Sequence, residues 1–371
     1  MFSTTGMKGG GYYDANSGPQ RGFLETATML MRSEIRTMRL PPAPEPITIV
    51  DYGSAEGRNA IVATRPLVAE LRRRTDQSVH LVYNDVPTND FKQLVTNIAA
   101  AEFPAGVHAF ASGRSFYEQI CASGSVAIAH SSSALHWLSA SPARGIKEHS
   151  FAPFADEDER RAFSAQAEGD WTVFLRHRAV ELRPGGKLLA FMLGNDNGAC
   201  GLAKPFDLLD SLLREMVAEG SVSGAAYDAL ACPLHWRTID EVLAPITGEN
   251  APLAGLYRVE HVGFHAAPCA LIAEYRQSGD AERYAERFTG TLRAAMEGLI
   301  ANAIFGGDQE APGLDELFDR LRNGIAMEPE RYRFDFAQLY VLFTRTDATV
   351  PSTSQSRNGS AAPTSPTIRA V

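Results

Sequence analysis

Residues 47–59, ITIVDYGSAEGRN, carry the clearest structural signal in this chain of 371 residues. The first of them are apolar or β-branched, which is typical of a buried parallel strand. The turn that follows contains Gly53 and Gly57, and glycine between a strand and a helix lets the backbone approach a ligand that a Cβ would exclude. We therefore expect a nucleotide-type ligand at this turn, although an ordinary corner capped by Asp51 is the alternative.

The spacing around these glycines favours one class of ligand over another. The pattern Gly53-x-x-x-Gly57 is not the G-x-G-x-x-G of dinucleotide-binding folds, so a dinucleotide is not the first expectation. Asp51 precedes the first glycine by two positions and suits the ammonium group of S-adenosylmethionine. A second acid, Asp85, follows a predicted strand at 79–84, where nucleotide-binding α/β folds hold a ribose diol. A turn or cap aspartate is the alternative there.

Composition limits the class of protein. An apolar fraction of 44% and a charged fraction of 21% describe a soluble globular chain, long enough for one large or two modest domains. The net charge of −9 argues against nucleic acid as a partner. The four cysteines lack C-x-x-C spacing, which argues against a zinc site and for a reducing compartment. Without a membrane-spanning apolar stretch or a signal-peptide pattern, we expect a cytoplasmic protein.

Strands alternate with helices along much of the chain, which indicates βαβ units and a mostly parallel sheet. After the first strand we expect strands at 79–84, 107–111, 125–130, 187–193, 258–266 and 336–344, and helices at 21–40, 60–74, 89–101, 280–304 and 314–322. Residues 195–260 look helical, with an apolar face that suits a lid. Glycines 9–11 argue against regular structure in residues 1–20, and the composition of 347–371 predicts a disordered tail.

Several short motifs occur in the order found in one enzyme family. They are MKGG with a following Tyr and N-S-x-x-Q at 7–20, D-x-G-x-x-x-G-x-N at 51–59, N-D-x-P-x-N-D-F at 84–91, S-F-Y at 115–117, H-S-S-x-x-L-x-W-L-S at 130–139, P-G-G at 184–186, a Pro and Glu-Val pair at 233–242, and R-A-x-x-E at 293–297. Together they resemble the SABATH methyltransferases. Members of that family use S-adenosylmethionine to methylate small carboxylic acids or, in some cases, xanthine-type nitrogens.

The resemblance implies a fold and a set of partners. The fold would be the Rossmann-like class I methyltransferase fold of the α/β class, with helices on both faces of the sheet and a helical cap over the active site. Its parts would be an active-site segment at 1–20, a cofactor-binding domain at 21–194 and 258–346, a cap at 195–257 with a further helix near 308–330, and a tail at 347–371. S-adenosylmethionine would be the cofactor, S-adenosylhomocysteine its product and a small carboxylic acid the substrate. A homodimer is also implied, without metal, nucleic acid or membrane.

Residue roles follow from the same resemblance. The positions that match cofactor-binding residues are Ser17, Asp51, Gly53, Asn59, Asp85, Val86, Ser115, Phe116, Ser131 and Ser132. Gln20 and Trp137 match the two residues that hold the substrate carboxylate. The other positions that match the substrate pocket are Lys8, Tyr13, Ser133, His136, Phe206, Leu292 and Phe336. Ser133, Phe206 and Leu292 replace a frequent Tyr, Trp and Met, which leaves the identity of the acid open.

The expected chemistry is simple, because an acid that is already ionised at neutral pH needs no general base. It needs an oxygen placed about 3 Å from the methyl group, and the amide of Gln20 and the indole N–H of Trp137 would supply that placement. A dry pocket favours a reaction that turns a cation and an anion into neutral products. N-methylation of a heterocycle near His136 and a non-catalytic binding protein are the alternatives. An ordinary core tryptophan at 137 and a hydrogen-bonded neutral His136 would explain those two residues without a site.

Overall fold

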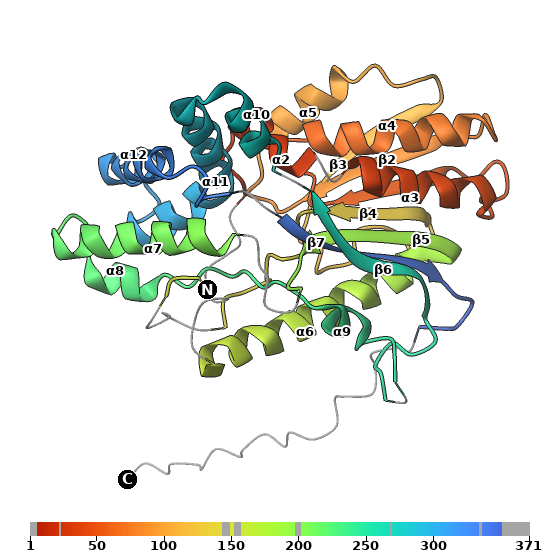
Figure 1. Cartoon of the computed structure of the whole chain (residues 1–371). Helices are drawn as coiled ribbons and strands as arrows, with labels where there is room; N and C mark the ends of the chain where they lie inside the picture. Colours follow the sequence, from red (N-terminus) through yellow and green to blue (C-terminus); the bar gives the residue numbers. More distant parts are fainter. Residues whose placement is uncertain are drawn as a thin grey trace, which may run out of the picture.

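The computed structural model describes residues 6–21, 24–142, 149–151, 157–196, 202–248, 250–267, 269–333 and 336–350. Within these ranges the strands form one sheet in the order β3-β2-β1-β4-β5-β7-β6 (Figure 1). The strands are β1 Ile47–Tyr52, β2 Val79–Asp85, β3 Val107–Gly113, β4 Val126–Ser132, β5 Leu182–Leu193, β6 Tyr257–Ala267 and β7 Phe336–Arg345. β1 to β5 are parallel to one another, and β7 is antiparallel to both β5 and β6. This confirms the expected α/β class and the mostly parallel sheet.

The central strands are buried on both faces, as their continuous apolar sequences predict. All six residues of β1 are buried, and they divide between two cores: Ile47 and Ile49 pack on one side of the sheet, Val50 and Tyr52 on the other. The polar ends of β3 and β4 stay paired in register with their neighbours, so both strands run two residues beyond their predicted ends. The carboxyl ends of the parallel strands therefore lie together at one edge of the sheet.

Helices cover both faces of the sheet and extend beyond its carboxyl edge (Figure 1). They are α1 Tyr12–Asn16, α2 Gly18–Arg21, α3 Leu24–Thr37, α4 Arg58–Arg72, α5 Phe91–Ala99, α6 Glu157–Glu181, α7 Ala203–Ala218, α8 Gly224–Ala229, α9 Ile239–Leu243, α10 Ala270–Ser278, α11 Ala281–Ile304 and α12 Pro312–Met327. In Figure 1, α3, α4 and α5 lie on one face, and α6 with α9 on the other. α7, α8, α11 and α12 pack together beside the sheet.

The helical layer differs in membership from the range expected for the cap. α11, expected in the cofactor-binding domain, packs against α12 and α8 in this layer. α9, expected in the cap, lies against α6 instead, where the indole N–H of Trp171 donates to the carbonyl of Val242 at 2.9 Å. α6 and α10 were not predicted at all. The predicted tail from residue 351 onward lies outside the described residues.

The expectation that residues 1–20 lack regular structure is wrong for residues 12–21, which form α1 and α2. The reason is a tertiary contact. The backbone N–H groups of Gly11 and Asp14 donate to the two carboxylate oxygens of Glu56, at 2.6 and 2.8 Å. These donors belong to the start of α1, where N–H groups have no partner within the helix, so an acid from another part of the chain stabilises a helix that its own glycines disfavour.

An ion pair between Arg178 and Glu181 on α6 is completely buried, with 0% of either side chain exposed. The guanidinium donates to the Phe116 carbonyl at 2.7 Å and to the Glu118 carbonyl at 2.8 Å. Glu181 accepts from the hydroxyl of Tyr52 at 2.5 Å and from backbone N–H groups of the same loop. The pair therefore fixes the segment that carries Phe116 against the end of β1.

Replacing Arg178 by Met should lower the free energy of unfolding by about 3–5 kcal/mol, because Glu181 would stay buried without its cation. Urea denaturation at neutral pH measures the loss. Arg161→Met is the matched control on the same helix, since Arg161 pairs with Asp158 in a contact where both side chains are exposed, and it should change little. Equal effects of the two substitutions would contradict the role assigned to the buried pair.

Candidate active site

The turn after β1 is shaped by two glycines. Gly53 has φ +88°, and a Cβ on it would lie 2.3 Å from the Cβ of Ala134. Gly57 has φ +97°, and its Cβ would lie 2.4 Å from Cδ1 of Leu94. Both positions have a left-handed backbone, and at both a Cβ would lie too close to a neighbouring side chain. The close approach at both glycines is to the protein's own side chains, and the approach to a ligand expected from the sequence stays a prediction.

Two acids stand at the carboxyl ends of β1 and β2. Asp51 is buried and bonded on both oxygens, to Nδ1 of His130 at 2.8 Å and to the hydroxyl of Ser54 at 2.7 Å. Asp85 accepts from the backbone N–H groups of Ala55 at 2.7 Å and Val86 at 2.8 Å. Burial raises the pKa of Asp85 to about 6, although the two backbone donors oppose the shift. The carboxyl of Asp85 thus changes its protonation close to neutral pH.

Three hollows meet at this edge of the sheet. We call them the outer hollow, with an empty volume of about 1070 Å³, the inner hollow, about 560 Å³, and the corner hollow, about 370 Å³. Tyr13 and Ser133 line all three. Gln20 lines the corner and inner hollows, and Trp137 lines the outer and inner hollows. The hollows are therefore neighbours around Tyr13 and Ser133, not separate sites.

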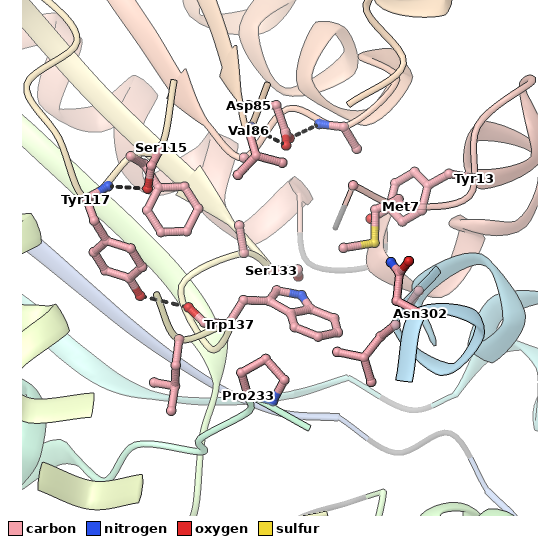
Figure 2. Close-up of a pocket in the computed structure, with 18 of the residues that line it drawn as sticks. Met7, Tyr13, Asp85, Val86, Ser115, Tyr117, Ser133, Trp137, Pro233 and Asn302 are labelled. Atoms are coloured by element: carbon pink, nitrogen blue, oxygen red, sulfur yellow. Dashed lines mark hydrogen bonds between the residues drawn. The ribbon is translucent and has the colours of Figure 1, made fainter. Parts of the chain in front are cut away.

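Most residues singled out in the sequence line these hollows. In the outer hollow they are Tyr13, Gly53, Asp85, Val86, Ser115, Phe116, Ser133 and Trp137 (Figure 2). In the corner hollow they are Tyr13, Gln20, Asp51, Gly53, Asn59, Ser132 and Ser133. In the inner hollow they are Tyr13, Gln20, Ser133, His136, Trp137, Phe206 and Leu292. Segments from both ends of the chain thus converge on one place.

Three of the singled-out residues line none of the hollows. The ammonium of Lys8 pairs with Glu297 at 2.7 Å. The hydroxyl of Ser17 accepts from the amide of Asn59 at 3.0 Å, and that of Ser131 donates to the carbonyl of Tyr52 at 2.8 Å. These contacts stabilise the walls of the hollows without lining them. The side chain of Phe336 lies outside the described residues.

The inner hollow is mostly apolar. Most of its polar groups lie where it meets the other two hollows, and we call this place its mouth. Its apolar lining is Met7, Leu193, Leu202, Phe206, Leu234, Leu292, Ala295 and Met296. Burial, together with the charge of Arg237, lowers the pKa of His136 to about 3, so the imidazole is neutral. Oε1 of Gln20 and Nδ1 of His136 are buried without a hydrogen-bond partner among the described residues. Buried polar atoms without partners are uncommon, and both of these belong to residues that line the hollow.

Residues 6–14 connect the α11 side of the hollows with the sheet side. Lys8 is attached to α11 twice, through its ammonium on Glu297 and through its backbone N–H on the Ala294 carbonyl at 3.0 Å. Glu56 holds the same segment from the sheet side. Sequence reasoning passed over both glutamates, although Glu56 lies inside the glycine motif and Glu297 ends R-A-x-x-E. It also passed over Met7, Ala55, Tyr117, Ala134, Leu138, Leu230, Pro233, Leu299 and Asn302, which line the outer hollow.

Neither a metal-binding cluster nor a membrane-spanning helix occurs within the described ranges. Within them, no group of three or more His, Cys, Asp or Glu side chains is placed to hold a metal ion. Nor does any helix there have the length and apolar character needed to cross a membrane.

Comparison with known proteins agrees with this geometry. The chain is 29% identical over 320 residues to the O-methyltransferase acrG of Aspergillus aculeatus, covering 80% of this chain and 84% of the relative. It is 26% identical over 341 residues to the salicylate/benzoate carboxyl methyltransferase of Arabidopsis thaliana, covering 85% of each.

A solved structure shares the fold. Loganic acid methyltransferase with S-adenosylhomocysteine superposes with a TM-score of 0.73 at 23% identity, over 92% of this chain and 98% of the other. The family model described as SAM-dependent carboxyl methyltransferase matches residues 2–346, which is nearly the whole chain. The resemblance found in the sequence motifs is thereby confirmed: the protein belongs to the SABATH-type family of carboxyl methyltransferases that use S-adenosylmethionine.

Proposed function

We propose that this enzyme methylates the carboxylate of a small, largely apolar acid whose carboxylate lies at the mouth of the inner hollow. The observation that carries the proposal is the meeting of the three hollows at Tyr13 and Ser133. A carboxylate at that meeting point has the corner and outer hollows, which we assign to the cofactor, on one side. It has the apolar inner hollow on the other. Such placement of two reactants accounts for much of the barrier in reactions of this type.

The cofactor's place follows from the donors and acceptors available. Asp51 and Asn59 in the corner hollow suit the amino-acid end of S-adenosylmethionine. Asp85 suits the ribose hydroxyls, since its carboxylate keeps lone pairs beyond the two that the backbone occupies. Val86 and Phe116 offer apolar surface for an adenine. When bound there, the cofactor supplies a methyl group on a positively charged sulfur.

The polar groups at the mouth of the inner hollow suit an anion that must stay nucleophilic. Gln20 and Trp137 offer neutral N–H donors. Burial raises the pKa of Tyr13, so its hydroxyl also stays protonated. No lysine or arginine occurs among the described residues that line this hollow, and Lys8 is held by Glu297. Because the acid is already ionised at neutral pH, the residues need only orient its carboxylate and exclude water.

N-methylation of a heterocycle is the second candidate, and His136 is the observation that favours it. Its neutral imidazole has a buried nitrogen without a partner among the described residues, which suits a ring nitrogen or amide of a ligand. An assay that transfers a labelled methyl group from the cofactor separates the two candidates. Mild base hydrolyses a methyl ester and leaves an N-methyl product intact.

Location and assembly are further parts of the proposal. The sequence-based expectation of a cytoplasmic protein and the family-based expectation of a homodimer are kept here as predictions. Sedimentation of the purified protein at several concentrations would test the second directly.

Cofactor affinity should fall as the pH drops below about 6, because protonated Asp85 loses its charge toward the ribose hydroxyls. Well above that pH Asp85 is almost fully ionised, and affinity should level off. Asp85→Ala should weaken binding by about ten- to a hundred-fold near pH 7.5 and remove the pH dependence. Calorimetric titration at about pH 5, 6 and 7.5 measures this. Asp76→Ala, an exposed aspartate before the same strand, is the control and should match the wild type.

Trp137→Phe should lower kcat/KM for the best acid by about ten- to a hundred-fold, since one of two bonds to a charged carboxylate is lost. Gln20→Leu should do the same, and the double variant should lose less than the sum, because both donors hold one group. Steady-state assays with labelled cofactor on a panel of aromatic, indolic and isoprenoid acids test this. Variants that fold, bind cofactor and make ester at near-normal rates would refute the assignment.

A further inference from the structure

The outer hollow has two walls of different character. One wall comes from the sheet and carries Asp85, Val86 and Phe116, which the proposed function assigns to the cofactor. The facing wall comes from the segment after α8 and from the second half of α11, and its residues include Leu230, Ala231, Pro233, Ala295, Leu299, Asn302 and Ala303. In Figure 2, Asp85 and Val86 lie on one side of the hollow and Pro233 on the other, with Trp137 between them. Nothing in the proposed function uses this second wall.

The second wall suits an apolar ligand. Asn302 is its one residue with a polar side chain, and it is exposed at the edge. Leu299 and Ala303 remain partly exposed, although they lie in a concave place. Apolar surface that lines a cavity and is left open to water is typical of a ligand site. The alanines on both elements present short side chains to the hollow.

The outer hollow is continuous with the place proposed for the carboxylate. Met7, Trp137 and Ala295 line both the outer and the inner hollow. The inner hollow ends against side chains that are almost fully buried, with Phe206 and Leu292 each 3% exposed. This buried, mostly apolar lining suits a compact acid. From the same carboxylate position, the outer hollow leads past Ala295 and Leu299 toward solvent.

We propose that the outer hollow holds an apolar chain attached to the substrate's carboxylate, so that the preferred substrate is an acid with a flexible hydrocarbon extension. This rests on the proposed function and names its substrate class. The chain would lie along Leu230, Pro233 and Leu299, and its far end would reach water near Asn302. Each methylene buried on this wall strengthens binding by about fourfold.

The test is kcat/KM for unbranched acids of about six to fourteen carbons, with benzoic acid as the compact reference. In the wild type, kcat/KM should rise with chain length over several carbons and then level off. Ala303→Phe fills the hollow from α11, and Ala231→Phe fills it from the opposite element. Either should flatten the rise, so that the ratio of the longest to the shortest acid falls at least tenfold. Ala281→Phe, the same change on α11 away from the hollows, should keep the wild-type slope.

Each outcome has a defined meaning. If no acid is converted to an ester, the proposed function itself fails. If compact acids are esterified as well as long ones, or if Leu292→Phe in the inner hollow flattens the slope and the two outer variants do not, the function stands and this inference is overturned. Calorimetry with S-adenosylhomocysteine on each variant shows whether the added ring has displaced the cofactor. A variant that binds it normally and loses only the long acids supports the proposal.

Discussion

The turn after β1 can touch the turn after β4 only because residue 53 carries no side chain, and the site depends on that contact. Gly53 lies against Ala134, next to Ser133, whose own φ is +57°. That unusual backbone is held by the Ser133 N–H on the Phe191 carbonyl at 2.9 Å and by Gln338, which donates to the Ser133 hydroxyl at 2.8 Å. The two turns bring the acids of the sheet edge and the donors of residues 133–137 to one meeting point.

Residues 6–14 complete the site by joining its two halves. They have no strand in the sheet, and their structure comes from acids on either side: Glu56 and Asp90 near the sheet, and Glu297 on α11. Such a segment is ordered only while both halves are in place. The hollows that Met7 and Tyr13 help to line are therefore formed by tertiary contacts, and the local sequence contributes little.

Sequence reasoning succeeded where a signal was local. The central strands were predictable because they are continuous apolar runs, and Asp51 and Asp85 because each stands at the end of a predicted strand. α1 was missed because it depends on Glu56, far along the chain. α6 was missed because charged and apolar residues mix along its 25 residues. Leu230 and Leu299 line the outer hollow from remote elements without a motif, so no pattern in the sequence could have joined them.

The two walls of the outer hollow also differ in how freely they can change. The sheet wall is tied to backbone conformation, because Gly53 has no tolerable replacement and Asp85 anchors the backbone of Ala55. The opposite wall consists of alanine and leucine side chains on a helix and a short loop, and none of its alanines needs an unusual backbone angle. Single substitutions there alter shape alone. Such a division leaves one wall free to change shape by substitution while the other stays fixed by its backbone.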